Sequence, residues 1–335
     1  MKPNGKLAAA TENFMAIPNF VPKYEINANS FVLNYKRFLE RYLSHGEPSE
    51  DTLRNYYSSI DSYIDWCHYN KRQPLEITEY EFTYYRDVLI RLKMKKSSIK
   101  SKLNAIKQFY NTAVKLGLIK VNPAKDVGVK AYEPKDISPL KFLRIEQLEH
   151  LLSIIPDDEE HVENIRDKVM IMLMALEGLR TIEVYRMSVA DIDWRVKTIY
   201  IHGKGHNDFI YPRSDVLKYL HKYIKLRYFN KMKIDALGEP VFTAVGNRNR
   251  GGRIDRRNIR RSIDAWLDTA GYKKAGISCH MLRHTCGTLL YSKTKDLQIV
   301  KQVLRHSDIN ITSKYAHVFD KMDNRYTSII NIEKD

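Results

Sequence analysis

The chain lacks the features of a secreted or membrane protein. Only three cysteines occur in 335 residues, and their odd number and wide spacing do not suggest a disulfide framework. The densest apolar run, residues 169–176, is far shorter than the roughly 20 residues that cross a bilayer. Residues 1–10 also lack the long apolar stretch of a signal peptide. We therefore expect a cytoplasmic protein in a reducing compartment.

Motifs for nucleotide or metal chemistry are absent as well. Residues 203–205 read Gly-Lys-Gly but lack the spacing of a P-loop, and the carboxylate cluster at 157–160 reads as a solvated turn. His280 and His284 have the i, i+4 spacing of zinc ligands, but Arg283 would place a positive charge beside a bound cation. We expect no cofactor and no metal, and keep a zinc site or a metal-dependent nuclease as weaker alternatives.

Acidic residues are in deficit. The chain has 40 Asp and Glu against 56 Lys and Arg, so its formal charge is +16. Such an excess favours a polyanionic partner, with nucleic acid first and an acidic membrane surface second. The length is sufficient for two domains, and the 43% hydrophobic content is sufficient for a core in each.

The first part of the chain, from about residue 30 to 122, has the pattern of helices. Apolar residues recur there at three- and four-residue spacing. Thr78 followed by Glu81 is a capping box and predicts the start of one helix. The next helix begins with basic residues, which could meet DNA phosphates or could form a solvated cap. Its predicted DNA contacts are Lys95, Lys96, Ser97 and Lys100.

A second domain follows a proline-bearing linker at 131–140. Its helical stripes are interrupted by two strand candidates, Thr198 to His202 and Asp208 to Tyr211, whose glycine-bearing connection predicts a hairpin. We therefore predict a mainly α fold with a small antiparallel β-sheet. The predicted division is an N-terminal extension at 1–29, a helical domain at 30–130, the linker, an α+β domain at 141–318 and a tail at 319–335.

Basic side chains gather on one predicted helix near Cys279. Its geometry puts His280, Arg283, His284 and Gly287 on one face, opposite an apolar face. We expect the cationic face to point outward, with the glycine leaving room for a close ligand. The alternative is an ordinary amphipathic helix with surface histidines.

Four residues elsewhere in the sequence are candidates for the same site as this helix. Arg180 lies between a buried helix and a new helix N-terminus, where it could contact phosphate, and Glu183 could orient it. Lys204, at the predicted hairpin tip, is either solubilising or a proton donor or phosphate contact. Tyr315 is one of 22 tyrosines, and a phenol needs a base and cations nearby to attack phosphorus.

Together these residues resemble the active site of the tyrosine recombinase, or phage-type integrase, family. The matching elements, in the family's order, are Arg180 with Glu183 in Gly-Leu-Arg-x-x-Glu, Lys204 in a hairpin, His280-x-x-Arg283-His284, Leu304-x-His306 and Tyr315. The match spans about 141–318, whereas 30–122 agrees with the family's core-binding domain in layout only. Glu177 stands where the family often has threonine, and Arg305 stands where glycine is common.

The resemblance implies site-specific DNA recombination without metal or ATP. The implied roles are Tyr315 as nucleophile forming a 3′-phosphotyrosyl link, Arg180 and Arg283 as neutralisers of phosphate charge, His280 as general base, His306 as hydrogen-bond donor and Lys204 as acid for the leaving 5′-oxygen, with Glu183 and His284 supporting them. It also implies that two domains clamp double-stranded DNA and that four copies assemble on two sites, from a monomer or dimer without DNA. In a prokaryotic cell the protein would then lie with the nucleoid.

An arginine-rich stretch fits such a partner, because residues 248–261 contain seven arginines in fourteen positions. The DNA contacts predicted from it are Arg248, Arg250, Arg253, Arg256 and Arg257. A type IB topoisomerase and a DNA-binding regulator without chemistry remain the alternative functions. Integration or excision of a mobile element and resolution of chromosome dimers both remain open as roles for a recombinase.

Overall fold

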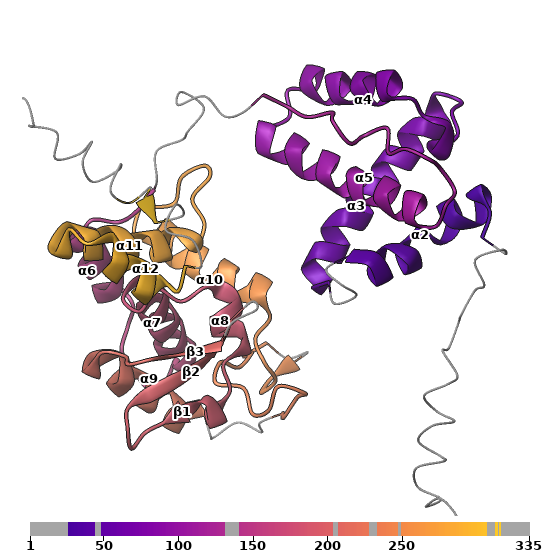
Figure 1. Ribbon diagram of the computed structural model, residues 1–335. Coiled ribbons are helices and arrows are strands. Elements are labelled where there is room, and N and C mark those ends of the chain that lie inside the picture. Colours follow the sequence, from indigo (N-terminus) through magenta and orange to yellow (C-terminus); the bar gives the residue numbers. More distant parts are fainter. Residues whose placement is uncertain are drawn as a thin grey trace, which may run out of the picture. The chain divides into compact units, whose positions relative to one another are not determined.

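The computed structural model describes residues 26–43, 48–130, 141–203, 207–227, 233–246, 249–306, 312, 313 and 315. These residues are mainly helical, with a small antiparallel sheet, which confirms the predicted fold class (Figure 1). They form two compact units, one before and one after the segment 131–140. None of the helices in these ranges is both long and apolar enough to cross a membrane.

The first unit is a helical domain. It contains α2 (Ala28–Tyr42), α3 (Glu50–Tyr69), the 3-10 helix η3 (Pro74–Glu76), α4 (Glu79–Arg91) and α5 (Lys96–Lys115). Helix α4 begins with the capping box predicted at Thr78 and Glu81, because each side chain accepts from the other residue's backbone N–H. Aromatic rings fill much of the core, and the hydroxyls of Tyr63 and Tyr110 lie 2.6 Å apart inside it.

Helix α5 confirms the expected combination of an apolar face and a basic start. Its apolar face is fully packed at Ile99, Leu103 and Ile106, largely against α3. Lys95 occupies the N-cap position without a capping hydrogen bond from its side chain, and Lys96 is the first helical residue. The burial of one face fixes how the helix rotates, and so keeps its basic start at the surface.

The second unit surrounds helix α7. Its elements are α6 (Ile145–Ser153), α7 (Val162–Ala175), α8 (Thr181–Arg186), the 3-10 helix η5 (Val189–Asp191), β1 (Ile192–Asp193), β2 (Thr198–His202), β3 (Asn207–Ile210), α9 (Ser214–Arg227), α10 (Arg256–Thr269), α11 (His280–Thr294) and α12 (Leu297–Leu304). Every residue of α7 from Ile165 to Ala175 is buried. The helix is packed against both α9 and α11, and α12 lies along α11 (Figure 1).

The predicted hairpin is present as β2 and β3. Ile199 pairs with Ile210 and His202 with Asn207 in an antiparallel register, so the second strand begins one residue earlier than predicted. Strand β1 adds a third member beside β2, and it could not be predicted because two residues cannot show alternation.

Candidate active site

Arg180 lies where α7 ends and α8 begins. The chain turns there at Gly178, whose φ of +67° is in the left-handed region, and a Cβ at this glycine would lie 2.6 Å from Cδ2 of Leu304. Glu183, one turn into α8, accepts from the backbone N–H of Arg180 at 2.8 Å and from its guanidinium at 2.7 Å. The carboxylate therefore holds both the backbone and the side chain of Arg180.

The same carboxylate is ionised in spite of its burial. Burial alone would raise the pKa of Glu183, but the positive charge of Arg305 and the hydrogen bonds and charge of Arg180 together hold that pKa below its usual value. Oε1 accepts from the guanidinium of Arg180, and Oε2 accepts both from the backbone N–H of Arg180 and from Nη2 of Arg305, which lies 3.1 Å away.

Arg283 is buried, which contradicts the expectation that the whole cationic face of α11 points outward. Its side chain is 1% exposed, and it donates hydrogen bonds to the backbone carbonyls of Gly178 and Leu304. Burial, followed by the charge of Arg180, lowers the pKa of Arg283 to about 10. The end of α12 covers this part of α11 and supplies the acceptor that makes the burial tolerable.

The two histidines of α11 stand at the edge of this buried arginine. His280 is exposed and His284 is half-buried, and their rings meet edge to face with centroids 4.6 Å apart. The expected outward orientation thus holds for His280 and only in part for His284.

Tyr315 is completely buried beside these groups. Its hydroxyl lies 3.2 Å from Nδ1 of His284, and its ring stacks with that of His306 at a centroid distance of 6.2 Å. Burial raises the pKa of Tyr315 to about 12, although the charges of Arg283 and Arg180 oppose the shift. The tyrosine is therefore within the electrostatic reach of both arginines.

The space at Gly287 is filled by the protein itself. A Cβ there would lie 2.7 Å from Cζ of Tyr315 and 2.8 Å from Cδ1 of Leu304. We had expected this glycine to leave room for a ligand, and that expectation is wrong for the state described here. The absence of a side chain instead lets the tyrosine ring lie directly on α11.

His306 follows α12 and is held by a neighbouring hydroxyl. Its Nδ1 lies 3.0 Å from Oγ1 of Thr312, a buried residue that the sequence reasoning did not identify. A contact at Nδ1 orients the ring and leaves Nε2 on its other side. No motif indicated Thr312, because the sequence alone does not show which hydroxyl lies beside His306.

Two predicted residues, Lys204 and Arg248, lie outside the described residues. Where the structure is described, it contains no group of three or more His, Cys, Asp or Glu side chains arranged to hold a metal ion. All three cysteines are buried as free thiols, and Cys286 of α11 packs with Val300 and Leu304 of α12.

The basic residues predicted to contact DNA differ in exposure. Those with exposed or half-buried side chains are Lys95, Lys96, Ser97, Lys100, Arg250, Arg256 and Arg257. Arg253 is different, since it is 7% exposed and its guanidinium bonds to Asp235 at 2.6 Å and to the backbone carbonyls of Tyr185 and Met187 at 2.9 Å. Its donors are used inside the fold, so we remove Arg253 from the proposed DNA contacts.

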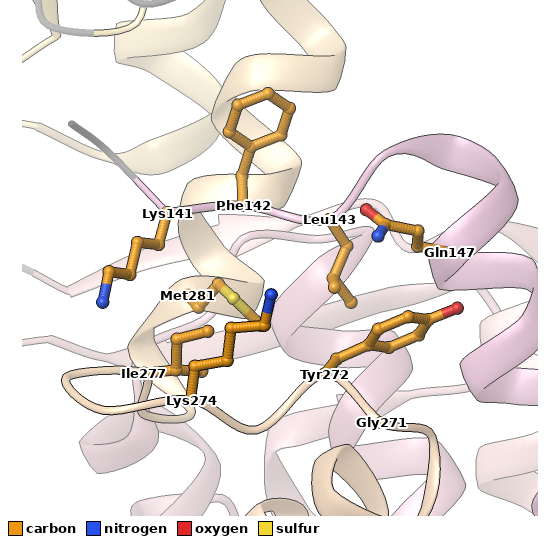
Figure 2. Close-up of a pocket in the computed structure, with 9 residues that line it drawn as sticks. All are labelled: Lys141, Phe142, Leu143, Gln147, Gly271, Tyr272, Lys274, Ile277 and Met281. Atoms are coloured by element: carbon orange, nitrogen blue, oxygen red, sulfur yellow. The ribbon is translucent and has the colours of Figure 1, made fainter.

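A separate hollow of about 310 Å³ lies beside the start of α11 (Figure 2). Its lining consists of Lys141, Phe142, Leu143, Gln147, Gly271, Tyr272, Lys274, Ile277 and Met281. Figure 2 shows Phe142 pointing away from the other lining side chains. Although Met281 directly follows His280, none of the nine lining residues belongs to the predicted site.

Comparison with known proteins connects this arrangement to one family. Residues 141–322 match the model of the phage integrase family, and residues 35–119 match the model of the phage integrase N-terminal SAM-like domain. Tyrosine recombinase XerC of Thermodesulfovibrio yellowstonii is 27% identical over 295 residues, covering 87% of this chain and 93% of the relative. Tyrosine recombinase XerC of Vibrio atlanticus is 29% identical over 298 residues, covering 87% and 90%.

Solved structures share the fold at lower identity. The XerH site-specific recombinase, in a post-cleavage complex with a palindromic difH substrate, has a TM-score of 0.67 and 18% identity, covering 91% of this chain and 98% of that one. The Tn1549 transposon integrase, residues 82–397, in complex with transposon right end DNA, has a TM-score of 0.66 and 16% identity, covering 91% and 100%.

Proposed function

We propose a reaction for this site from one premise: the chain belongs to the phage integrase family. It is a tyrosine recombinase, and its function is site-specific DNA recombination. The oxygen of Tyr315 bonds to the phosphorus of a DNA strand, the bond from phosphorus to the 5′-oxygen breaks, and the 5′-oxygen leaves as a hydroxyl. The resulting 3′-phosphotyrosyl ester conserves the bond energy, so the 5′-hydroxyl of another strand can reverse the attack without ATP.

Arg180 and Arg283 neutralise the non-bridging oxygens of that phosphate. Each guanidinium has five N–H donors, and the contacts to Glu183 and to the backbone carbonyls use only part of them. Donors that are fixed before the substrate arrives stabilise developing charge most effectively, because they do not reorganise during the reaction. The buried and hydrogen-bonded state of Arg283 supports this role.

Proton transfer is assigned to the histidines and the hairpin lysine. His280 acts as general base for the tyrosine hydroxyl, and His284, which contacts that hydroxyl at 3.2 Å, supports it. His306 donates to a phosphate oxygen through Nε2, opposite its contact with Thr312. Lys204 protonates the leaving 5′-oxygen.

The single observation that carries the proposal is the electrostatic environment of Tyr315. Tyr315 lies where two arginine charges act on its hydroxyl and a histidine contacts it. These side chains come from the start of α8, from α11 and from the chain beyond α12, so the fold gathers them from distant parts of the sequence.

The remaining proposals concern DNA and assembly. The helical domain at 30–130 and the catalytic domain at 141–318 each contact double-stranded DNA that carries a recombination site, and four copies assemble on two such sites. The phosphate contacts come from the basic start of α5 and from Arg250, Arg256 and Arg257, whose side chains are exposed or half-buried. The protein acts in the cytoplasm and, in a prokaryotic cell, with the nucleoid that contains its substrate.

Covalent trapping tests the reaction. The purified full chain is incubated with fragmented genomic DNA of its host in EDTA and denatured with SDS, and DNA that stays linked to protein is sequenced. Wild-type protein should retain DNA cut at a defined sequence. Tyr315→Phe should bind the same DNA and form no adduct, because only the hydroxyl oxygen is lost.

Tyr211→Phe is the matched control, because Tyr211 belongs to the same unit and is 79% exposed. It should form adduct as the wild type does. Adducts from Tyr315→Phe, or none from the wild type, would contradict the proposal. Adducts spread over all sequences, together with relaxation of any supercoiled plasmid, would indicate a topoisomerase instead, and sequence-specific binding without any adduct would indicate a regulator.

A further inference from the structure

Arg305 has a backbone conformation that disfavours its own side chain. It directly follows α12 and has φ of +52° and ψ of +49°, in the left-handed region. Glycine is the usual residue at such a helix end, because a Cβ is crowded there. An arginine at this position must therefore be compensated by what its side chain does.

The guanidinium of Arg305 is turned into the site and is 10% exposed. Nη2 lies 3.1 Å from Oε2 of Glu183 and 3.4 Å from the carbonyl oxygen of Gly178, and Nη1 donates to the carbonyl of Val303 at 2.9 Å. The Val303 contact satisfies the end of α12, as a helix cap would. The other two contacts have nothing to do with capping.

Those two acceptors are the supports of both catalytic arginines. Glu183 also accepts from the backbone N–H and the guanidinium of Arg180, and Gly178 also accepts from Arg283. Nη2 of Arg180 in turn donates to the backbone carbonyl of Arg305 at 3.4 Å. Arg305 is thus connected to Arg180 and to Arg283 through one shared acceptor each.

We propose that Arg305 is a positioning residue for the reaction: its guanidinium locks Glu183 and the Gly178 carbonyl, and so fixes Arg180 and Arg283 relative to one another. This inference rests on the proposed function of those two arginines. Oε2 of Glu183 accepts from Nη2 of Arg305 as well as from the backbone N–H of Arg180, so Arg305 adds a further contact that restrains the carboxylate against rotation. Its side chain works through these groups and not on the phosphate itself.

Arg305→Gly separates positioning from capping. Glycine suits the left-handed turn, so the variant should keep the wild-type melting temperature or exceed it. Substrate is a nicked duplex carrying the sequence recovered by covalent trapping, and adduct formation is followed in single turnover over a range of DNA concentrations. We expect the maximal rate to fall roughly 10- to 100-fold, as for a misplaced catalytic group, with the half-saturating DNA concentration nearly unchanged.

Arg305→Lys is the conservative partner, since it keeps the charge but lacks the planar guanidinium that contacts Val303 and the two site acceptors at once. It should recover part of the lost maximal rate and keep the wild-type melting temperature. If the glycine variant fails to fold, the lysine variant tests the proposal in its place. A maximal rate within about 2-fold of the wild type in Arg305→Gly, or in Arg305→Lys if the glycine variant does not fold, would overturn the proposal, because errors in position are costly. So would a loss that appears only in the half-saturating concentration.

The Arg180→Ala variant distinguishes two outcomes: that the role proposed for Arg305 is wrong, and that the proposed function itself is wrong. If the wild type forms no adduct, the proposed function itself is wrong. If the wild type forms adduct, Arg180→Ala abolishes it and Arg305→Gly leaves the rate unchanged, then only the role of Arg305 is wrong.

Discussion

Replacing Gly287 by alanine tests the position of the nucleophile. The new Cβ would lie 2.7 Å from Cζ of Tyr315 and 2.8 Å from Cδ1 of Leu304, closer than carbon atoms approach one another in proteins. The leucine methyl is the end of a flexible side chain and can move. The tyrosine ring is rigid and completely buried, so the substitution must displace it or strain α11.

Two effects of opposite sign decide the magnitude. In a helix interior alanine is favoured over glycine by about 0.8–1.0 kcal/mol, and overpacking a core costs about 1–3 kcal/mol. We therefore expect Gly287→Ala to lower the free energy of unfolding by up to about 2 kcal/mol, since the clash exceeds the gain in propensity. Without the clash, the same substitution would be stabilising.

A double-mutant cycle with Tyr315→Ala measures the clash directly. Thermal unfolding of the four proteins gives the coupling between the two sites. In the Tyr315→Ala background the rigid ring is gone, so Gly287→Ala should become neutral or stabilising. The reasoning would be refuted if Gly287→Ala raised the melting temperature equally in both backgrounds, because the tyrosine would then not rest on α11.

Two further predictions concern buried charge. The pKa of Glu183 is held below its usual 4.5, so its ionised form stabilises the fold above that pH and the contribution is lost as pH falls through the folded-state pKa. Glu183→Gln should cost about 3–5 kcal/mol at pH 7, as for other broken buried pairs, and unfolding monitored from pH 7 to 3 should then depend less on pH than in the wild type. Arg253→Ala should cost less, about 1–3 kcal/mol, because the Asp235 side chain that it leaves is 38% exposed while the carbonyls of Tyr185 and Met187 lose their donor. Arg257→Ala, at an exposed position, should change stability by less than about 0.5 kcal/mol and reduce the salt dependence of DNA binding by about one phosphate contact. Equal effects of the two arginine variants on stability would contradict the assignment.

Local sequence patterns predicted helices and strands correctly where one face of the helix or strand packs against its own domain and the other is exposed. The stripe along α5, the capping box at Thr78 and the hairpin of β2 and β3 each depend on residues near in sequence, and each is present. The site could not be predicted from such local patterns, because its residues are brought together by tertiary contacts. The site residues were predicted from the order and spacing of the motifs, which resemble those of the family.

Periodicity failed where distant segments cover a polar face. The helical period put Arg283 on the same face as His280 and so predicted that it is exposed. It contains no information on the end of α12, which buries the arginine and supplies a carbonyl acceptor for it. Arg253 was grouped with its neighbours by composition, although Asp235 and two carbonyls bind it inside the fold. In both residues the acceptors decide whether an arginine is buried, and acceptors that are far away in sequence leave no local signal.

We predict that Tyr315 must leave the position it occupies before it attacks a phosphate. Its ring is completely buried against Gly287, and burial raises the pKa of the phenol to about 12. The free energy that holds the ring there must be spent before the oxygen reaches phosphorus, and it therefore adds to the barrier for cleavage. Gly287→Ala weakens this packing without altering a charged group. It should consequently raise the rate of adduct formation while lowering stability, and a rate that falls in step with stability would show that the buried position is already the reactive one.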